Sequence, residues 1–211
     1  PEIDPSGPSH ALPVAVAAVV AVAVFLAYLP SLDHQFVNWD DDAYVTANPH
    51  IADGLSWDTV AWAFSLHGYA ANWHPLTWLS HALDVELHGR ADAGGHHMTN
   101  VILHAAAAGV LLLALWRLTG RLWPSAAVAA LFGLHPLHVE SVAWVAERKD
   151  VLCALLVFLT LWAYASYVRT GRRWRYALVV AAFAGALMSK PMAVTVPLVL
   201  LVLDGWPLGR L

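Results

Sequence analysis

An uncharged apolar run from Ala11 to Leu32 constrains the fold of this chain more than any other feature. About 20 apolar residues, rising about 1.5 Å each, cross the hydrocarbon core of a bilayer as one helix. The run is too long for a secretory signal peptide, and Glu2 and Asp4 precede it where such a peptide carries basic residues. We therefore predict a membrane-spanning helix over residues 11–32 and a disordered segment over residues 1–10.

The composition extends this prediction to the whole chain. Hydrophobic residues make up 59% and charged residues 12% of the 211 residues, whereas about a quarter of an average soluble domain is charged. Cys153 is the only cysteine and lies in an apolar run, so no disulfide forms within the chain. We predict an all-α, polytopic integral membrane protein, one membrane domain over residues 11–211 with about six transmembrane helices. The predicted spans are residues 11–32, 98–118, 124–146, 151–168, 175–190 and 191–204.

The last two spans are short, and only Ser189, Lys190 and Pro191 separate them. Proline lacks a backbone donor and restricts the preceding residue to extended geometry, which suits a turn. We predict a tight hairpin here, with one long bent helix as the alternative. A lysine at mid-membrane depth costs roughly 2.5–3.5 kcal/mol. We therefore expect Lys190 at the outer surface of the bundle, facing an acid or a lipid phosphate.

Basic residues of the short loops orient the predicted spans. Because short cytoplasmic loops are enriched in Lys and Arg, the side with seven basic residues is predicted to be the cytoplasm and the side with four the exterior. The loops 33–97 and 136–150 then face outward and hold twelve of the 15 acids. An outward active site explains this concentration, and so does plain solvation of the one large polar loop. The seven are Arg117, Arg121, Arg169, Arg172, Arg173, Arg175 and Arg210; the four are Arg90, Arg148, Lys149 and Lys190.

The large outer loop is predicted to contain helices of its own. Ser56 is placed to cap a helix that begins at Trp57. Residues 73–87 form a second amphipathic stretch. We expect both helices to lie at the membrane surface, with their aromatic side chains at the lipid boundary.

Three consecutive acids, Asp40, Asp41 and Asp42, stand just beyond the first predicted span. A carboxylate beside other carboxylates has a raised pKa, which suits a general base acting on a hydroxyl or amide acceptor. Aspartate also favours turns and helix starts, so a solvated turn is the plainer interpretation.

Cations and histidines of the outer loops are candidates for binding a phosphate or a sugar. Arg148 and Lys149 break the inside-positive trend, and arginine forks and lysine point charges both suit phosphate. With Lys190 they form a predicted phosphate-binding set; the alternative for the first two is a self-neutralised loop with Glu147 and Asp150. Four histidines of these segments can bind sugar, phosphate or metal. His74 lies in the motif NWHP, and His97 ends the motif GGHH; the other two are His81 and His104.

A third group, His135, His138 and Glu140, has ligand types that suit a divalent metal ion. Pro136 interrupts the helix that would align these side chains, so the metal signal is weak. No other cofactor is indicated, and nucleic acid is not expected as a partner.

Five stretches of these outer segments share a resemblance. They are FVNWDDDAYVTAN (36–48), NWHPLTWLSH (72–81), GGHHMTN (94–100), HPLHVESVAWVAERKD (135–150) and KP (190–191). Together they resemble the membrane half of bacterial proteins that join a GT-C-type glycosyltransferase to tetratricopeptide repeats. The eukaryotic relatives of that family are the transmembrane and tetratricopeptide-repeat O-mannosyltransferases. The resemblance extends over nearly the whole chain from Ala11.

The resemblance implies a partial GT-C fold in the bacterial cytoplasmic membrane, with its active face outward. In such enzymes the acidic motif of the first outer loop carries the catalytic base, which falls here on Asp40 and Asp41, with Asp42 as a further acid. The implied donor is a polyprenyl- or dolichyl-phosphate sugar, and the implied acceptor is a protein or a glycan. Family members continue past the equivalent of residues 206–210 with further helices and a repeat region, so we expect this chain to be the N-terminal part of a longer enzyme.

Two other functional classes stay open at this point. A metal-handling transporter would use the histidines, but transporters place ionisable residues at the bilayer midplane and the predicted spans are nearly free of charge. A non-catalytic membrane scaffold would use the aromatic outer loop to dock a partner.

Overall fold

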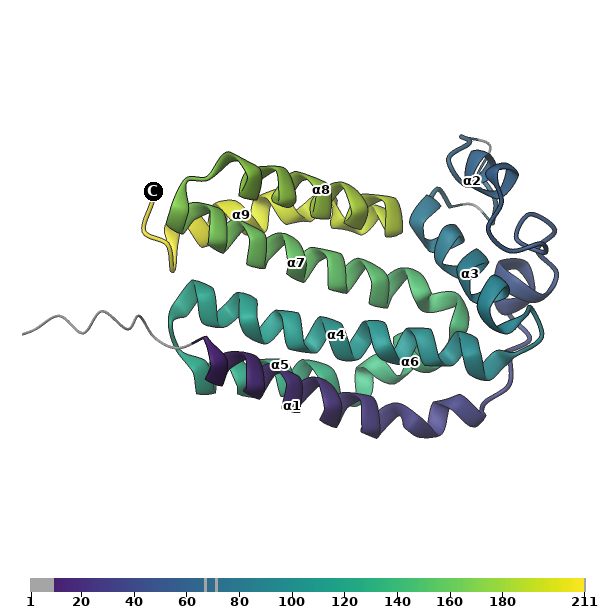
Figure 1. Cartoon of the computed structure of the whole chain (residues 1–211), viewed down its shortest axis with the longest axis horizontal. Helices are drawn as coiled ribbons and strands as arrows, with labels where there is room; N and C mark the ends of the chain where they lie inside the picture. The colour runs from purple at the N-terminus through teal and green to yellow at the C-terminus, as the bar shows by residue number, and fades with distance from the viewer. Residues whose placement is uncertain (1–9, 67, 71, 211) are drawn as a thin grey trace, which may run out of the picture.

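The computed structural model describes residues 10–66, 68–70 and 72–210, and the regular secondary structure of these residues is helical apart from one isolated β-bridge. The disordered segment predicted over residues 1–10 lies outside the described residues except for His10. Figure 1 shows a bundle of long helices lying side by side, with a compact outer loop at one end. The bundle helices are α1 (Ala11–Tyr28), α4 (Ala93–Thr119), α5 (Leu122–Leu134), α6 (Val139–Ala143), α7 (Arg148–Thr170), α8 (Arg173–Ser189) and α9 (Val196–Gly205).

The number of clear membrane spans is smaller than predicted. Within the described residues, three helical segments are long and apolar enough to cross a membrane: Ala11–Asp33, Ala93–Thr119 and Val145–Thr170. A fourth span is complete only if Leu122–Leu134 and Pro136–Ala143, which meet at 48°, are counted as one. The break falls where Pro136 cannot donate a helical hydrogen bond. The predicted spans 175–190 and 191–204 are short helices instead, and the segment Pro191–Gly205 qualifies only as a shorter apolar helix.

The turn between the last two helices follows the hairpin prediction. α8 ends at Ser189, and Lys190 is extended, with φ −154° and ψ 127°. The short helix η5 (Pro191–Thr195) then leads into α9, which runs back along α8 (Figure 1). Lys190 therefore lies at the end of the bundle that carries the outer loop.

The two predicted outer loops share one end of the bundle. The backbone N–H of Ala146 donates to the carboxylate of Asp41, which joins them directly. At the opposite end, Arg169 donates to the carbonyl of Arg117, and Arg175 donates to that of Ser166. The common face of residues 33–97 and 136–150 is thus confirmed, while its assignment to the exterior stays a prediction.

The outer loop is folded around its own aromatic core. It contains η2 (Asp42–Thr46), α2 (Trp57–Ala63) and α3 (Pro75–His88). Ser56 caps α2 as predicted, since its hydroxyl accepts from the N–H of Thr59 at 3.0 Å. Tyr44 and Trp78 pack with Val145 of the second outer segment in one buried cluster. This shared core holds the acidic segment against the start of α7.

Candidate functional site

Asp41 is the member of the acidic triplet that the fold holds in place. Its side chain is buried, and its two carboxylate oxygens accept from the N–H groups of Val37 and Ala146, both at 2.8 Å. Burial raises the pKa of Asp41 above its usual value, opposed by those two hydrogen bonds and assisted by the negative charge of Asp40. Asp42, by contrast, is exposed and accepts only from the next backbone N–H. A fixed carboxylate with a raised pKa has the properties of a general base.

Lys149 is connected to Asp41 through Ala146, to which both side chains are hydrogen-bonded. Its Nζ donates to the carbonyl of Ala146 at 3.0 Å, while the N–H of the same residue binds Asp41. The ammonium group also pairs with Glu147 at 2.6 Å and lies 5.1 Å from the centre of the Tyr44 ring. Asp41 and Lys149, an acid of the triplet and a cation of the second outer segment, thus bind the same residue, and their joint role in a site stays a prediction.

Lys190 faces an acid, as expected from its turn. Its Nζ pairs with the carboxylate of Asp150, which also accepts from the hydroxyl of Ser141 at 3.3 Å. About a quarter of each charged side chain stays exposed, 25% for Lys190 and 28% for Asp150. Because Asp150 directly follows Lys149 in the chain, both lysines lie at the same end of the bundle.

A cavity of about 320 Å³ opens beside this ion pair. Its walls are mostly apolar, and they also contain several polar side chains. The apolar lining includes Phe132, Val157, Phe158 and Met192, and the polar lining residues are His104, His138, Ser141, Asp150 and Lys190. An apolar cavity with a cation at its rim suits a molecule with a hydrocarbon part and an anionic group.

Arg148 does not have the exposed position that a phosphate clamp needs. The side chain is fully buried, and its guanidinium is bound by protein groups on every side. It pairs with Asp84 at 2.6 Å and donates to the carbonyl of His96 and the hydroxyl of Ser80, both at 2.8 Å. Its Nε donates to Asn100. These contacts fit a structural role, so the predicted phosphate set retains Lys149 and Lys190 as its accessible cations.

The predicted sugar- or phosphate-binding histidines are also buried. His74 and His97 have no exposed surface, and their ring nitrogens have no hydrogen-bond partner among the described residues. Burial, and secondarily the charge of Lys149, lowers the pKa of His74 to about 4, so this imidazole is neutral at physiological pH. His74 packs on Trp78, with ring centroids 4.5 Å apart. In this conformation neither histidine presents a charge to a substrate.

The predicted metal ligands His135, His138 and Glu140 are not gathered into a site. His135 and Glu140 are exposed, and Nδ1 of His135 accepts from the N–H of Leu137 at 3.2 Å. Pro136 separates α5 from the following turn and prevents a common helical face. Within the described residues, the potential ligand atoms that do come together belong to His81, Asp84 and His96. The sequence signal for Asp84 was its one-turn spacing from His81 in the amphipathic stretch 73–87.

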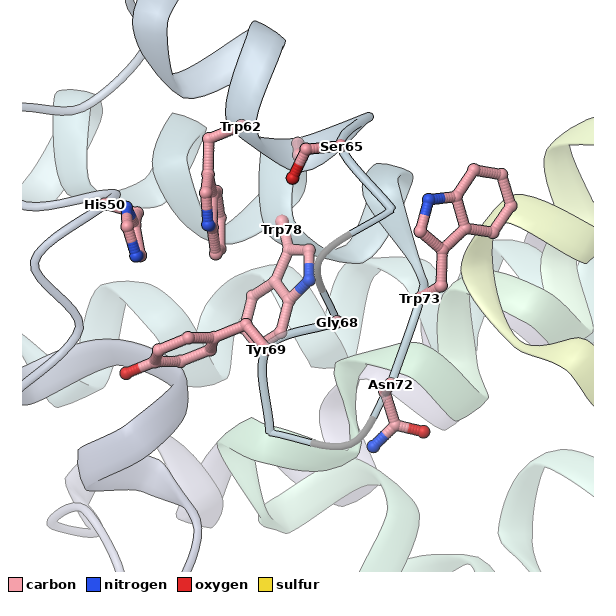
Figure 2. Close-up of a pocket in the computed structure, with 9 residues that line it drawn as sticks. His50, Trp62, Ser65, Gly68, Tyr69, Asn72, Trp73 and Trp78 are labelled. Carbon is pink, nitrogen blue, oxygen red and sulfur yellow. The ribbon is translucent and has the colours of Figure 1, made fainter.

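An aromatic pocket of about 250 Å³ lies in the outer loop (Figure 2). The rings of His50 and Trp62 are stacked, 4.3 Å apart and inclined by 12°. Asn72 lines the pocket and donates to the hydroxyl of Tyr44 at 3.4 Å. The pocket therefore adjoins Tyr44, whose ring also contacts the ammonium group of Lys149. Among the residues that the structure describes, no acid, lysine or arginine lines the pocket. Its remaining walls include Ser65, Tyr69, Trp73 and Trp78.

The bundle and its loop-bearing end define a multi-pass membrane protein with titratable groups concentrated at one end. The chain belongs to the family of dolichyl-phosphate-mannose-protein mannosyltransferases, whose sequence profile matches residues 91–207. The expected relation to the O-mannosyltransferases is thereby confirmed.

Curated O-mannosyl-transferases are similar to this chain over a longer stretch than the family profile covers. The protein O-mannosyl-transferase Tmtc2 of Drosophila melanogaster is 32% identical over 193 residues, which are 85% of this chain and 20% of the relative. TMTC1 of Mus musculus is 35% identical over 75% of this chain and 17% of its own length. TMTC4 of Mus musculus is 28% identical over 100% of this chain and 32% of its own length. The chain thus spans a third or less of these relatives. No solved structure matches it significantly.

Proposed function

We propose that this chain is the sugar-transferring portion of a membrane glycosyltransferase that uses a polyprenyl-phosphate sugar as donor and a polypeptide as acceptor. The proposal rests on one observation: Asp41 and Lys149 are both hydrogen-bonded to the backbone of Ala146. It holds a potential base beside a potential phosphate ligand. Transfer to a hydroxyl needs both groups, because the acceptor loses a proton while the donor loses a phosphate.

In the proposed reaction, Asp41 accepts the proton of the acceptor hydroxyl as its oxygen attacks the anomeric carbon. The bond from that carbon to the phosphate oxygen breaks, and the lipid phosphate leaves with the bonding electrons. Lys149 and Lys190 stabilise the negative charge of the leaving phosphate. The relatives' names supply mannose as the expected sugar and oxygen as the expected acceptor atom.

The cavity beside Lys190 is the proposed donor site. Its apolar walls would contact the first isoprene units, and Lys190 would exchange its partner Asp150 for the phosphate. The partial exposure of this ion pair makes the exchange cheaper than opening a fully buried pair.

The aromatic pocket is the proposed acceptor side. An aromatic-lined pocket whose polar groups include the amide of Asn72 and the hydroxyls of Ser65 and Tyr69 suits an uncharged stretch of polypeptide. Its contact with Tyr44 places it next to the lysine that the donor phosphate would meet. An outward orientation in the bacterial cytoplasmic membrane, and further helices and repeats beyond this chain, belong to the same proposal.

The test is a transfer assay with a polyprenyl-phosphate mannose and an acceptor peptide. Asp41→Asn keeps the size of the side chain and removes the base, so transfer should fall by about 10²- to 10⁴-fold. Asp42→Asn, at an exposed neighbour, is the matched control and should retain nearly full activity. Full transfer by the Asp41→Asn variant would refute the assignment of the base. Absence of transfer by the whole native protein would favour the non-catalytic scaffold.

A further inference from the structure

Three buried side chains at the junction of α3 and α4 come together without serving the proposed transfer. They are His81 and Asp84, one helical turn apart on α3, and His96 near the start of α4. Their exposed fractions are 0%, 1% and 0%. One ligand atom from each lies within 4.8 Å of the other two. Such a convergence of two imidazoles and a carboxylate has the composition of a transition-metal site.

The imidazoles of this group are short of hydrogen-bond partners. Neither ring nitrogen of His81 has one among the described residues, and the same holds for Nε2 of His96. Nδ1 of His96 lies 3.4 Å from Asp84 Oδ2. A buried polar atom without a partner destabilises the folded protein, so a ligand bound to these nitrogens would remove that cost. A metal ion would satisfy one nitrogen of each ring at the same time.

The carboxylate is already oriented as metal-binding carboxylates are. Thr99 donates to Asp84 Oδ1 at 2.7 Å, and Arg148 donates to Oδ2 at 2.6 Å. Outer-shell hydrogen bonds of this kind fix the direction of a ligating carboxylate. They also explain why Arg148 is buried here: it orients and partly neutralises Asp84.

The charge balance of the group decides the kind of ion. Asp84 and Arg148 compensate one another, so the site offers little net negative charge. Ca²⁺ and Mg²⁺ require several oxygen ligands, which this group lacks. Zn²⁺ binds neutral imidazoles with one carboxylate and accepts a set of three protein ligands with an additional small ligand.

We propose that His81, Asp84 and His96 bind one zinc ion that ties the outer-loop helix α3 to the bundle helix α4. Phe36 packs on the ring of His96, with centroids 5.6 Å apart, and the next residue, Val37, donates to Asp41. The ion therefore stabilises the segment that holds the acidic triplet. This metal site does not depend on the proposed transferase activity.

The first measurement is the metal content of the whole protein purified in detergent. About one equivalent of zinc per chain is expected. Protein in which cobalt replaces zinc should show the visible absorption of a tetrahedral Co²⁺ site. A chelator should lower the Tm, and Zn²⁺, but not Mg²⁺, should restore it. A native protein without zinc, whose Tm neither the chelator nor added Zn²⁺ changes, would overturn the proposal.

The second measurement uses variants. His81→Gln with His96→Gln keeps hydrogen-bonding groups of similar size but removes the imidazole ligands, so zinc content should fall at least tenfold. His88→Gln, at an exposed histidine on the same helix, is the control and should keep its zinc. Retention of zinc by a folded double variant would contradict the site. If the double variant does not fold, the native metal content and cobalt spectrum decide the matter.

Discussion

Arg148 and Asp84 form a fully buried ion pair, with Nη2 of the arginine 2.6 Å from Oδ2 of the aspartate. The two residues are 64 positions apart and lie on α7 and α3. The pair therefore fastens the outer loop to the bundle next to the acidic segment. Breaking a buried pair leaves one desolvated charge, which costs far more than losing a surface pair.

The first prediction follows from this burial. In the metal-free protein, Arg148→Met should lower the free energy of unfolding by about 3–5 kcal/mol, because Asp84 is then left as an unpaired buried charge. Lys149→Met should cost less than Arg148→Met, because the Lys149–Glu147 pair keeps 13% and 16% of its side chains exposed and water screens the carboxylate that remains. Thermal and denaturant unfolding of the purified protein measure both. Equal stability of the two variants would mean that Arg148 is not fixed by Asp84.

The second prediction concerns the pH dependence of transfer. The pKa of Asp41 is raised, by burial first and by the charge of Asp40 in addition. A base works only when deprotonated, so kcat/KM should fall as the pH drops through that raised pKa. Asp40→Asn removes one cause of the increase, and the acid limb of the profile should move to lower pH.

The matched variant is Asp42→Asn, which removes a charge that is not among the main causes of the raised pKa of Asp41. Its acid limb should coincide with that of the native protein. A limb that moves equally in both variants would point to a general change of surface charge rather than to Asp41.

The third prediction separates the two possible roles of Lys190. Lys190→Met should leave membrane insertion unchanged, since it removes a charge from an apolar setting. It should weaken donor binding about tenfold to a hundredfold, the worth of a charge-assisted hydrogen bond of about 1.5–3 kcal/mol. Binding should be measured in detergent at low salt, where screening is weakest.

Arg210→Met, at an exposed cation paired with Asp204, is the control for Lys190 and should bind the donor normally. Asp150→Asn releases Lys190 from its partner and should preserve donor binding or improve it. Unchanged affinity in the Lys190→Met variant would show that the lysine serves only its ion pair with Asp150.

The fourth prediction compares two tryptophans of the outer loop. Trp73 lines the aromatic pocket, whereas Trp57 is 88% exposed and lies outside its lining. Trp73→Ala should raise the KM for the acceptor peptide more than about fivefold, as loss of an aromatic binding contact of over 1 kcal/mol does. Donor KM should not change. Trp57→Ala should behave as the native protein, and equal effects of the two would exclude the pocket as the acceptor side.

The sequence was sufficient for features that depend on neighbours along the chain. The apolar run 11–32, the Ser56 cap and the turn at Pro191 follow from local length, capping and the missing proline donor. The common end of the two outer loops followed from charge asymmetry. The count of about six spans is not confirmed, because the helix is broken at Pro136 and the helices over the last two predicted spans are shorter than the clear membrane spans.

The candidate site was predictable in its residue types but not in its roles. The sequence motifs predicted that Asp41, Lys149 and Lys190 lie at one end of the bundle, and the structure places them there. Arg148 and Lys149 are adjacent cations in the sequence, and nothing local distinguishes them. One is fully buried against Asp84, and the other faces Tyr44 and keeps part of its surface.

By itself, the sequence determined that this chain enters a membrane as apolar helices and has most of its acids and histidines at one end. Apolar length and charge placement act on each segment separately, so they can be read without knowing the fold. Only the tertiary structure decided which aspartate is held by Ala146, which cation is buried with Asp84, and which imidazoles converge. Those outcomes depend on packing between segments far apart in the chain, where burial changes the free energy of each charge.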